Sequence, residues 1–233
     1  MVRSKYWVCT YSFVVCLFLI ILLWGNRAVT VVSENLSGER RHCIIIDPGH
    51  GGEDGGAVSY TGEPESHYNL EISYILKDLL NFLGYSTKML RTENISIYSS
   101  GTTLAQKKIS DLKERVRIAN ETGNAIFLSI HQNHFSDSRY SGAQVFYAAF
   151  DGSKALAETI QDSFTSALNT RNKRQIKKGS GIYLMEHIQC PGVLIECGFL
   201  SNPEENAKLK NPEYQKQLCS IIATSLSRYI SNT

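Results

Sequence analysis

The sequence predicts a three-layer α/β domain, a largely parallel twisted sheet flanked by helices, preceded by an N-terminal transmembrane or signal-anchor helix. Short apolar runs bounded by turn residues alternate with longer segments in which apolar residues recur every three or four positions. Three of the apolar runs lead directly into His50, His131 and Glu196, residue types that bind metal or transfer protons. Because ligands bind beyond the carboxyl ends of parallel strands, these positions predict a single site.

Length and composition fit one compact domain with an additional segment. The chain has 233 residues, and its hydrophobic fraction of 42% is sufficient for a sizeable core. A formal net charge of +2 argues against a nucleic-acid-binding surface. The cysteines form no CxxC pair and no dense framework, so we expect free thiols rather than disulfides in the folded domain. These cysteines are Cys43, Cys190, Cys197 and Cys219.

The first 26 residues differ in composition from the rest of the chain. An uncharged run over residues 6–24 is close to the ~20 residues that cross a bilayer as a helix, and two cations precede it. We therefore expect residues 1–26 to be an uncleaved membrane anchor, and a cleaved signal segment is the alternative. Residues 27–41 then form a polar linker, and residues 42–233 form an exported catalytic domain.

The first predicted strand begins at Cys43 and stops at Asp47-Pro48-Gly49, so that His50 follows among glycines. The glycines allow steep turns and a close approach of the backbone to a ligand. They do not form a phosphate-binding loop, since no Lys-Ser/Thr pair follows them and no helix begins at the last glycine.

A helix is predicted from Glu65 to about Leu83, because apolar residues recur at helical spacing. The apolar stripe consists of Ile72, Ile75, Leu76, Leu79, Leu80 and Leu83. Counting back seven positions from Ile72 puts Glu65 on the same stripe, and a crossover connection brings this end of the helix near His50. A carboxylate there is paired or binds metal, or it complements the helix dipole as a first-turn acid, and the spacing favours neither.

The later elements follow from the same patterns. In order, we predict a strand over 85–90, a polar loop over 94–101, a helix over 111–121, a strand over 125–130, a strand over 144–149, a helix over 156–168, an edge strand over 182–185, a strand over 193–195, and a last helix that buries residues 218–229. The segment 171–178 carries five cations, which indicates a solvated surface or, as the alternative, a surface for an anionic polymer.

The predicted site has the composition of a catalytic zinc centre. His50, Glu65 and His131 form a His₂Glu set, which in catalytic sites leaves one coordination position open for water. Glu196 remains as the general base that a zinc hydrolase needs. His134 is the rival ligand, but it lies on the turn after the strand, where it would face solvent.

Support for the metal ligands is expected from few side chains. Asp47 would hold the turn or orient a ligand, and Asn69 lies one helical turn after Glu65. With so little support and a glycine-rich loop around His50, we expect weak zinc binding. An accessory exported protein that orders this loop would then stabilise zinc binding by linkage.

Four motifs carry a resemblance to a known family. They are IDPGHGGEDGGA at 46–57, ESHYNL at 65–70, AN at 119–120 together with SIHQN at 129–133, and VLIECGFLSN at 193–202. In this order they resemble the zinc-dependent N-acetylmuramoyl-L-alanine amidases of the third amidase type, over about residues 42–230. The resemblance implies that His50, Glu65 and His131 bind Zn²⁺ and that Glu196 is catalytic. Two positions depart from the family pattern, His134 and Cys197.

The resemblance also implies a substrate and a setting. The substrate would be the amide between the lactyl group of N-acetylmuramic acid and L-alanine in peptidoglycan. A short, membrane-anchored single domain is most similar to the germination-specific amidases of spore formers. Those enzymes strip peptides from cortex muramic acid so that muramic-δ-lactam can form, which would place this protein on the extracytoplasmic face of a bacterial membrane, in the forespore or spore envelope.

Two other functions stay open at this point. A peptidoglycan-binding protein that has lost catalysis would lack Glu196 or a ligand, and this chain retains all four residues. A zinc carboxypeptidase acting on stem peptides would need a cation for the substrate carboxylate. Arg91 is the strand-end arginine that would serve.

Overall fold

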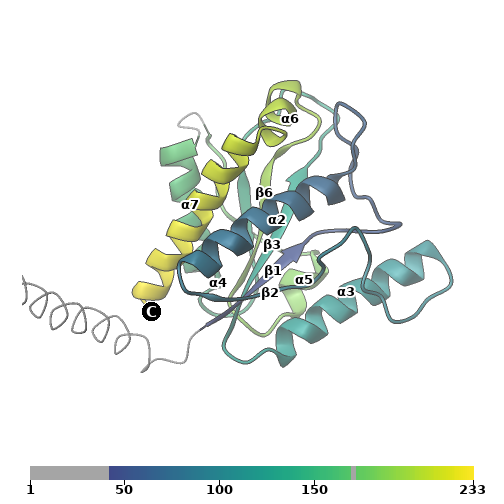
Figure 1. The fold of residues 1–233 in the computed structure, drawn as a ribbon, viewed down its shortest axis with the longest axis horizontal. Helices are drawn as coiled ribbons and strands as arrows, with labels where there is room; N and C mark the ends of the chain where they lie inside the picture. Colours follow the sequence, from purple (N-terminus) through teal and green to yellow (C-terminus); the bar gives the residue numbers. More distant parts are fainter. Residues whose placement is uncertain (1–41, 169–171) are drawn as a thin grey trace, which may run out of the picture. The chain divides into compact units, whose positions relative to one another are not determined.

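The computed structural model describes residues 42–168 and 172–233 (Figure 1). The predicted anchor or signal segment and the linker lie outside the described residues. Within the described part of the chain, no helix is long and apolar enough to cross a membrane.

A six-stranded sheet forms the centre of the domain, with the strand order β2-β1-β3-β6-β4-β5. Its strands are β1 (Cys43–Pro48), β2 (Ser86–Met89), β3 (Ala125–Asn133), β4 (Gln144–Tyr147), β5 (Lys177–Lys178) and β6 (Gly192–Phe199). The first four strands in this order are parallel to one another, whereas β4 is antiparallel to β6 and β5 is parallel to β4. The prediction of a largely parallel sheet is therefore confirmed.

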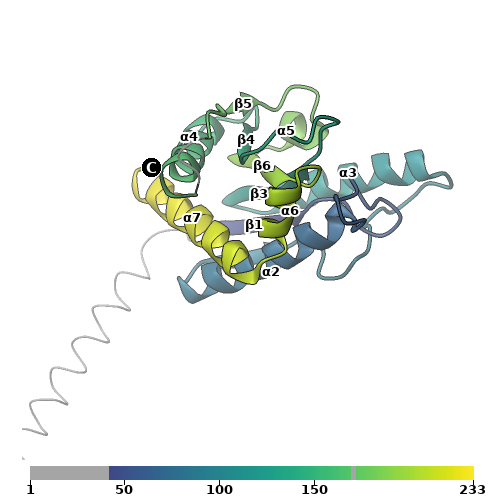
Figure 2. The ribbon, with the colours of Figure 1, turned by 90° about the horizontal axis from the view of Figure 1, so that it is seen from above.

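Helices cover both faces of this sheet (Figure 2). They are α2 (Glu65–Phe82), α3 (Leu104–Glu121), α4 (Ser153–Ser163) with a π-helical turn (Phe164–Leu168), α5 (Tyr183–His187), α6 (Pro203–Leu209) and α7 (Pro212–Ser231). One core cluster joins α2, α4 and α7 to one face of the sheet, and a second joins α3 and α5 to the other face. The domain thus has three layers, as the alternation of strands and amphipathic helices predicts.

The central strands are apolar on both faces because each face is covered. In β1, Ile44 and Ile46 belong to the core on the α2 side, while Ile45 belongs to the core on the α3 side. All three side chains are fully buried. Continuous apolar runs of this kind are typical of parallel strands with helices on both faces.

The structure differs from the sequence-based prediction at several elements: β3 continues to Asn133, β6 covers Gly192–Phe199, and a separate helix, α6, precedes α7. Residues 182–185 do not form an edge strand. Residues 183–187 form a short helix, α5, which buries Leu184 and Met185, and the edge strand of the sheet is β5 instead. Helix α3 begins at Leu104 rather than at residue 111, since Thr103 and Gln106 form a reciprocal capping box just before the apolar positions start.

Candidate metal centre and active site

Three of the predicted site residues meet at the carboxyl edge of the sheet. His50 follows β1, Glu65 begins α2, and His131 lies near the end of β3. Glu65 Oε2 is 3.2 Å from His50 Nε2, and Glu65 Oε1 is 2.9 Å from His131 Nδ1. One ligand atom from each residue lies within 4.8 Å of the other two. The structure therefore brings together the His₂Glu set that the sequence predicts.

Glu65 is a buried carboxylate with a defined set of donors. Its side chain accepts hydrogen bonds from the backbone N–H of Ala57 (3.0 Å) and of Gln132 (3.1 Å), and from the side-chain amide of Asn69 (3.1 Å). Only 3% of Glu65 is exposed. These contacts decide between the two interpretations of Glu65: it is a buried, paired carboxylate rather than a surface acid that complements the helix dipole.

Glycines allow the three side chains to approach one another. A Cβ on Gly49 would lie 2.1 Å from Nε2 of His131, and a Cβ on Gly56 would lie 2.6 Å from Oε2 of Glu65. His50 itself has a φ of 60°, in the left-handed region that residues with side chains seldom adopt. Such a backbone is retained where the surroundings impose it, often at functional sites.

Two polar side chains orient the proposed ligands directly. Asp54 Oδ2 is 2.9 Å from Nδ1 of His50, which leaves Nε2 of that ring turned toward Glu65. Asn69 donates both to Glu65 and to the carbonyl of Gly49, as its place in the sequence predicts. Sequence reasoning missed Asp54, although a carboxylate four residues after a histidine in a glycine turn is a usable signal.

Two buried arginines fix the turn that carries His50. Arg91 donates to the carbonyls of Pro48 (2.8 Å) and Gly49 (3.0 Å), and Arg115 donates to those of Pro48 (3.0 Å) and His50 (2.8 Å). Both arginines are only 2% exposed. The expectation of thin support around a loose glycine loop is therefore wrong, since long-range contacts from α3 and from the segment after β2 hold the loop.

Asp47 holds the turn, as predicted, and lies outside the metal-ligand set. It forms a buried ion pair with Arg115 and accepts a hydrogen bond from Ser129 Oγ at 2.6 Å. The guanidinium of Arg91 donates hydrogen bonds to backbone carbonyls, including that of Ser66. These contacts use the N–H groups of Arg91, so this arginine is not available as the cation for a substrate carboxylate.

Glu196 lies beside the three residues on the neighbouring strand. In the register of β3 and β6 it is paired with His131. Its Oε2 atom is buried and has no hydrogen-bond partner in residues 42–168 and 172–233. Burial raises the pKa of Glu196 to about 7, and the charge of Glu65 adds to this effect while His131 opposes it. A buried carboxylate oxygen without a partner is costly, which indicates that this oxygen interacts with a ligand or reactant.

The charges of the cluster favour a cation at its centre. Burial opposes the ionised form of Glu65, but its hydrogen bonds to the two histidines hold its pKa well below the usual range. Burial likewise opposes a charge on His50, yet its contacts with Asp54 and Glu65 raise its pKa to about 9. Carboxylates that draw positive charge onto neighbouring imidazoles would equally attract a divalent ion.

The remaining candidates lie away from this cluster. His134 is exposed and is not a ligand in this arrangement. Cys197 is 1% exposed and packs in the core on the α2 side, so neither departure from the family pattern alters the site. Cys43, Cys190, Cys197 and Cys219 are free thiols, as predicted.

Comparison with known proteins assigns the family. The sequence pattern described as N-acetylmuramoyl-L-alanine amidase matches residues 44–228. This chain belongs to the N-acetylmuramoyl-L-alanine amidase family. It is therefore an enzyme, an amidase that acts on peptidoglycan, and the resemblance inferred from its motifs is confirmed.

Similar proteins include amidases of Bacillus subtilis and Clostridioides difficile. The germination-specific N-acetylmuramoyl-L-alanine amidase of Bacillus subtilis is 36% identical over 224 residues, which cover 94% of this amidase and 92% of that protein. The structure of the CwlD amidase from Clostridioides difficile in complex with the GerS lipoprotein has a TM-score of 0.79 and 35% identity, over 83% of this chain and 100% of that one. Another amidase structure, from Clostridium difficile 630, has a TM-score of 0.73 and 30% identity, over 84% of this chain and 100% of that one.

Proposed function

We propose that this amidase is zinc-dependent and cleaves the amide between the lactyl group of N-acetylmuramic acid and L-alanine in peptidoglycan. In this proposal His50, Glu65 and His131 hold the zinc ion, and Glu196 transfers the proton. The observation that carries the proposal is the buried, unpartnered Oε2 of Glu196 beside a His₂Glu set.

The residues present fit a zinc ion by chemistry and spacing. Two imidazoles and one carboxylate are a usual donor set of catalytic zinc, with a fourth position open. The N–O separations of 2.9 Å and 3.2 Å are close to the ~3.3 Å between two ligand atoms that each lie ~2.0 Å from a tetrahedral ion. When bound, zinc would polarise the scissile carbonyl and lower the pKa of a water molecule to about 7.

The protein's own step is a proton transfer by Glu196. In its ionised form Glu196 accepts a proton from the attacking water, and it then delivers this proton to the amine of the departing L-alanine. One carboxylate can serve both halves of this step, because it is a base when ionised and an acid once protonated.

We further propose a role in the spore envelope. The germination-specific relative of Bacillus subtilis supports an exported enzyme that acts on cortex peptidoglycan during cortex maturation, in muramic-lactam formation, or in germination. Residues 1–26 would provide the membrane anchor or signal segment, residues 27–41 the linker, and residues 42–233 the catalytic domain. The structure of a relative in complex with the GerS lipoprotein supports an exported accessory partner for this amidase as well.

Mass spectrometry of digested muropeptides tests the reaction. The full-length chain in detergent should release intact stem peptides and leave peptide-free muramic acid. The Glu196→Gln variant should retain its zinc and lose turnover, whereas Glu158→Gln, an exposed substitution on α4, should leave both unchanged.

Three results would contradict the proposal. Stem peptides shortened at their carboxyl end would indicate a carboxypeptidase, and unchanged muropeptides would indicate an inactive binding protein. Loss of zinc from Glu196→Gln would make Glu196 a ligand rather than the base.

A further inference from the structure

Arg174 is held in a fixed orientation at the carboxyl edge of the sheet. Its Nε donates to the carbonyl of Ser141 at 2.9 Å, and its Nη1 donates to Oε1 of Gln144 at 3.1 Å. The guanidinium carbon lies 4.4 Å from the ring centroid of Phe199 and 5.9 Å from that of Tyr140. The remaining N–H groups, including both on Nη2, make no hydrogen bond with residues 42–168 and 172–233.

The charge of Arg174 is not balanced by an ion pair. No carboxylate in the described part of the chain pairs with it, although it is half-buried. The charge of Arg174 acts on Glu205 electrostatically, but the carboxylate of Glu205 accepts its hydrogen bonds from the backbone N–H groups of Gly142 (2.7 Å) and Phe199 (2.8 Å). A guanidinium that is oriented by the protein and lacks a counter-charge is suited to bind an external carboxylate.

The strand register places Gln144, the hydrogen-bond partner of Arg174, next to the catalytic residues. His131 on β3 is paired with Glu196 on β6, and Glu196 is paired with Gln144 on β4. Residues paired in this way project from the same face of the sheet. Gln144, which accepts the hydrogen bond from Arg174, therefore continues a row that begins at the metal-ligand set.

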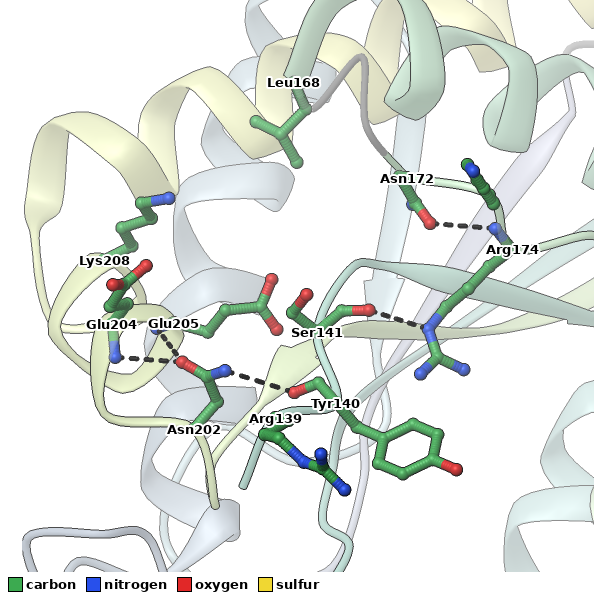
Figure 3. Close-up of a pocket in the computed structure, with 11 residues that line it drawn as sticks. Arg139, Tyr140, Ser141, Leu168, Asn172, Arg174, Asn202, Glu204, Glu205 and Lys208 are labelled. Carbon is green, nitrogen blue, oxygen red and sulfur yellow. Dashed lines mark hydrogen bonds between the residues drawn. The ribbon is translucent and has the colours of Figure 1, made fainter. Parts of the chain in front are cut away.

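The loop after β3 completes the surroundings of this arginine. Because β4 is antiparallel to β6, the loop over residues 134–143 stays at the carboxyl edge and crosses the end of β6. It carries Tyr140, whose side chain is 46% exposed. Figure 3 shows the guanidinium of Arg174 and the ring of Tyr140 on the same side of the Ser141 backbone, away from Leu168 and Lys208, at one end of a pocket of about 910 Å³.

We infer that Arg174 binds a free carboxylate of the peptide branch of the substrate, so that it selects acidic stem peptides. The inference rests on the proposed amidase reaction and names the part of the substrate that the site recognises. The N-acetylated sugars of the glycan are uncharged, whereas the stem peptide carries free carboxylates, so the cation matches the peptide side. Tyr140 and Phe199 flank the guanidinium and limit the directions from which a carboxylate can approach.

The geometry indicates which carboxylate this is. Neighbouring strands are ~4.8 Å apart, so Gln144 lies ~10 Å from His131 along the row, measured between backbones. An extended peptide advances ~3.3 Å per residue. The bound carboxylate therefore belongs to the second or third residue of the stem.

Two matched substrates test the inference on the full-length enzyme. One is an N-acetylmuramoyl tripeptide with its stem carboxylates free, and the other is the same compound with these carboxylates amidated. We expect amidation to lower kcat/KM of the unmodified enzyme about 10-fold or more. Arg174→Gln should lose a similar factor on the free-carboxylate substrate and should no longer distinguish the two, while Arg174→Lys should retain part of the distinction.

Arg139→Gln is the matched control. Arg139 lines the same pocket, but its side chain is 89% exposed and pairs with Asp137, so its removal should leave the ratio of the two kcat/KM values unchanged. Zinc content and the circular dichroism spectrum show whether each variant is folded. An equal loss on both substrates in Arg174→Gln, or no distinction by the unmodified enzyme, would overturn the inference.

Failure of the inference is separable from failure of the proposed reaction. Equal turnover of both substrates at the lactyl–alanine bond would leave the amidase reaction standing and remove the role of Arg174. Binding of the free stem tripeptide, measured by isothermal titration, does not require turnover. This binding should be weakened about 10-fold in Arg174→Gln, and equal binding by the variant and the unmodified chain would contradict the inference even if no substrate were hydrolysed.

Discussion

At the scale of single residues, the site depends on side chains that are not themselves ligands. Asp54 accepts a hydrogen bond from His50 and also pairs with Lys108 at 3.0 Å. A carboxylate behind a ligating histidine fixes the ring and its tautomer and makes the ligand more basic. In the proposed zinc site, the hydrogen bond of Asp54 would therefore bear directly on how strongly His50 binds the ion.

We predict that Asp54→Ala weakens zinc binding by about 10- to 100-fold, because His50 loses the acceptor that orients it. Isothermal titration of the metal-stripped full-length chain measures the change. Asp137→Ala is the control, since Asp137 is paired with Arg139 at the surface. An affinity of Asp54→Ala within a factor of two of the unmodified chain would show that His50 is oriented by other contacts.

The sequence predicted the residues of the site that follow apolar runs, and it missed those that depend on distant packing. His131 and Glu196 come directly after such a run and His50 follows one after a short turn, so strand recognition was enough to group them. The role of Arg115 depends on which turn of α3 faces β1, 65 residues away from the His50 carbonyl that it holds. No local pattern contains that information.

At the scale of elements, helix α3 stabilises the turn that carries His50. Arg115 extends from α3 to pair with Asp47 at the end of β1. It also pairs with Asp111 on its own helix, where Nε of Arg115 lies 2.6 Å from Oδ2 of Asp111. The two carboxylates outweigh the effect of burial and raise the pKa of Arg115 further above its usual value. Removing one partner from such a buried pair leaves an uncompensated charge.

We predict that Arg115→Ala lowers the free energy of unfolding by about 3–5 kcal/mol, because Asp47 would remain buried and charged. Urea denaturation measures the loss. Arg117→Ala, on the same helix but with a side chain that is 52% exposed, should cost at most about 1 kcal/mol. If both variants lost the same amount, the buried pair would have no special role in stability.

At the scale of the whole molecule, the layers were predictable and the complete strand order was not. Alternating apolar runs and amphipathic helices determine that helices cover both faces. They do not determine that β4 joins the sheet beside β6 and runs antiparallel to it. That placement depends on the path of the loop over residues 134–143, and it creates the row from the metal-ligand set to Arg174.

The stability of the whole domain should reflect the cost of keeping Glu196 ionised. Its pKa of about 7 in the folded chain lies above the ~4.3 of an unfolded glutamate, so folding favours the protonated form. The contribution of this group to stability is then fully present below pH ~4.3 and is lost as the pH rises through about 7. To act as a base, Glu196 must be ionised, whereas the folded chain favours its protonated form.

We therefore predict that, in the metal-stripped chain, Glu196→Gln is more stable than the unmodified protein at pH 8 and loses this advantage as the pH falls to 4. Glutamine has nearly the same shape and does not ionise, so the difference between the two proteins isolates the buried charge. Thermal unfolding followed by circular dichroism across this pH range measures it, with Glu158→Gln as the surface control. A stability difference that stays constant with pH would mean that Glu196 does not carry a raised pKa in the folded chain.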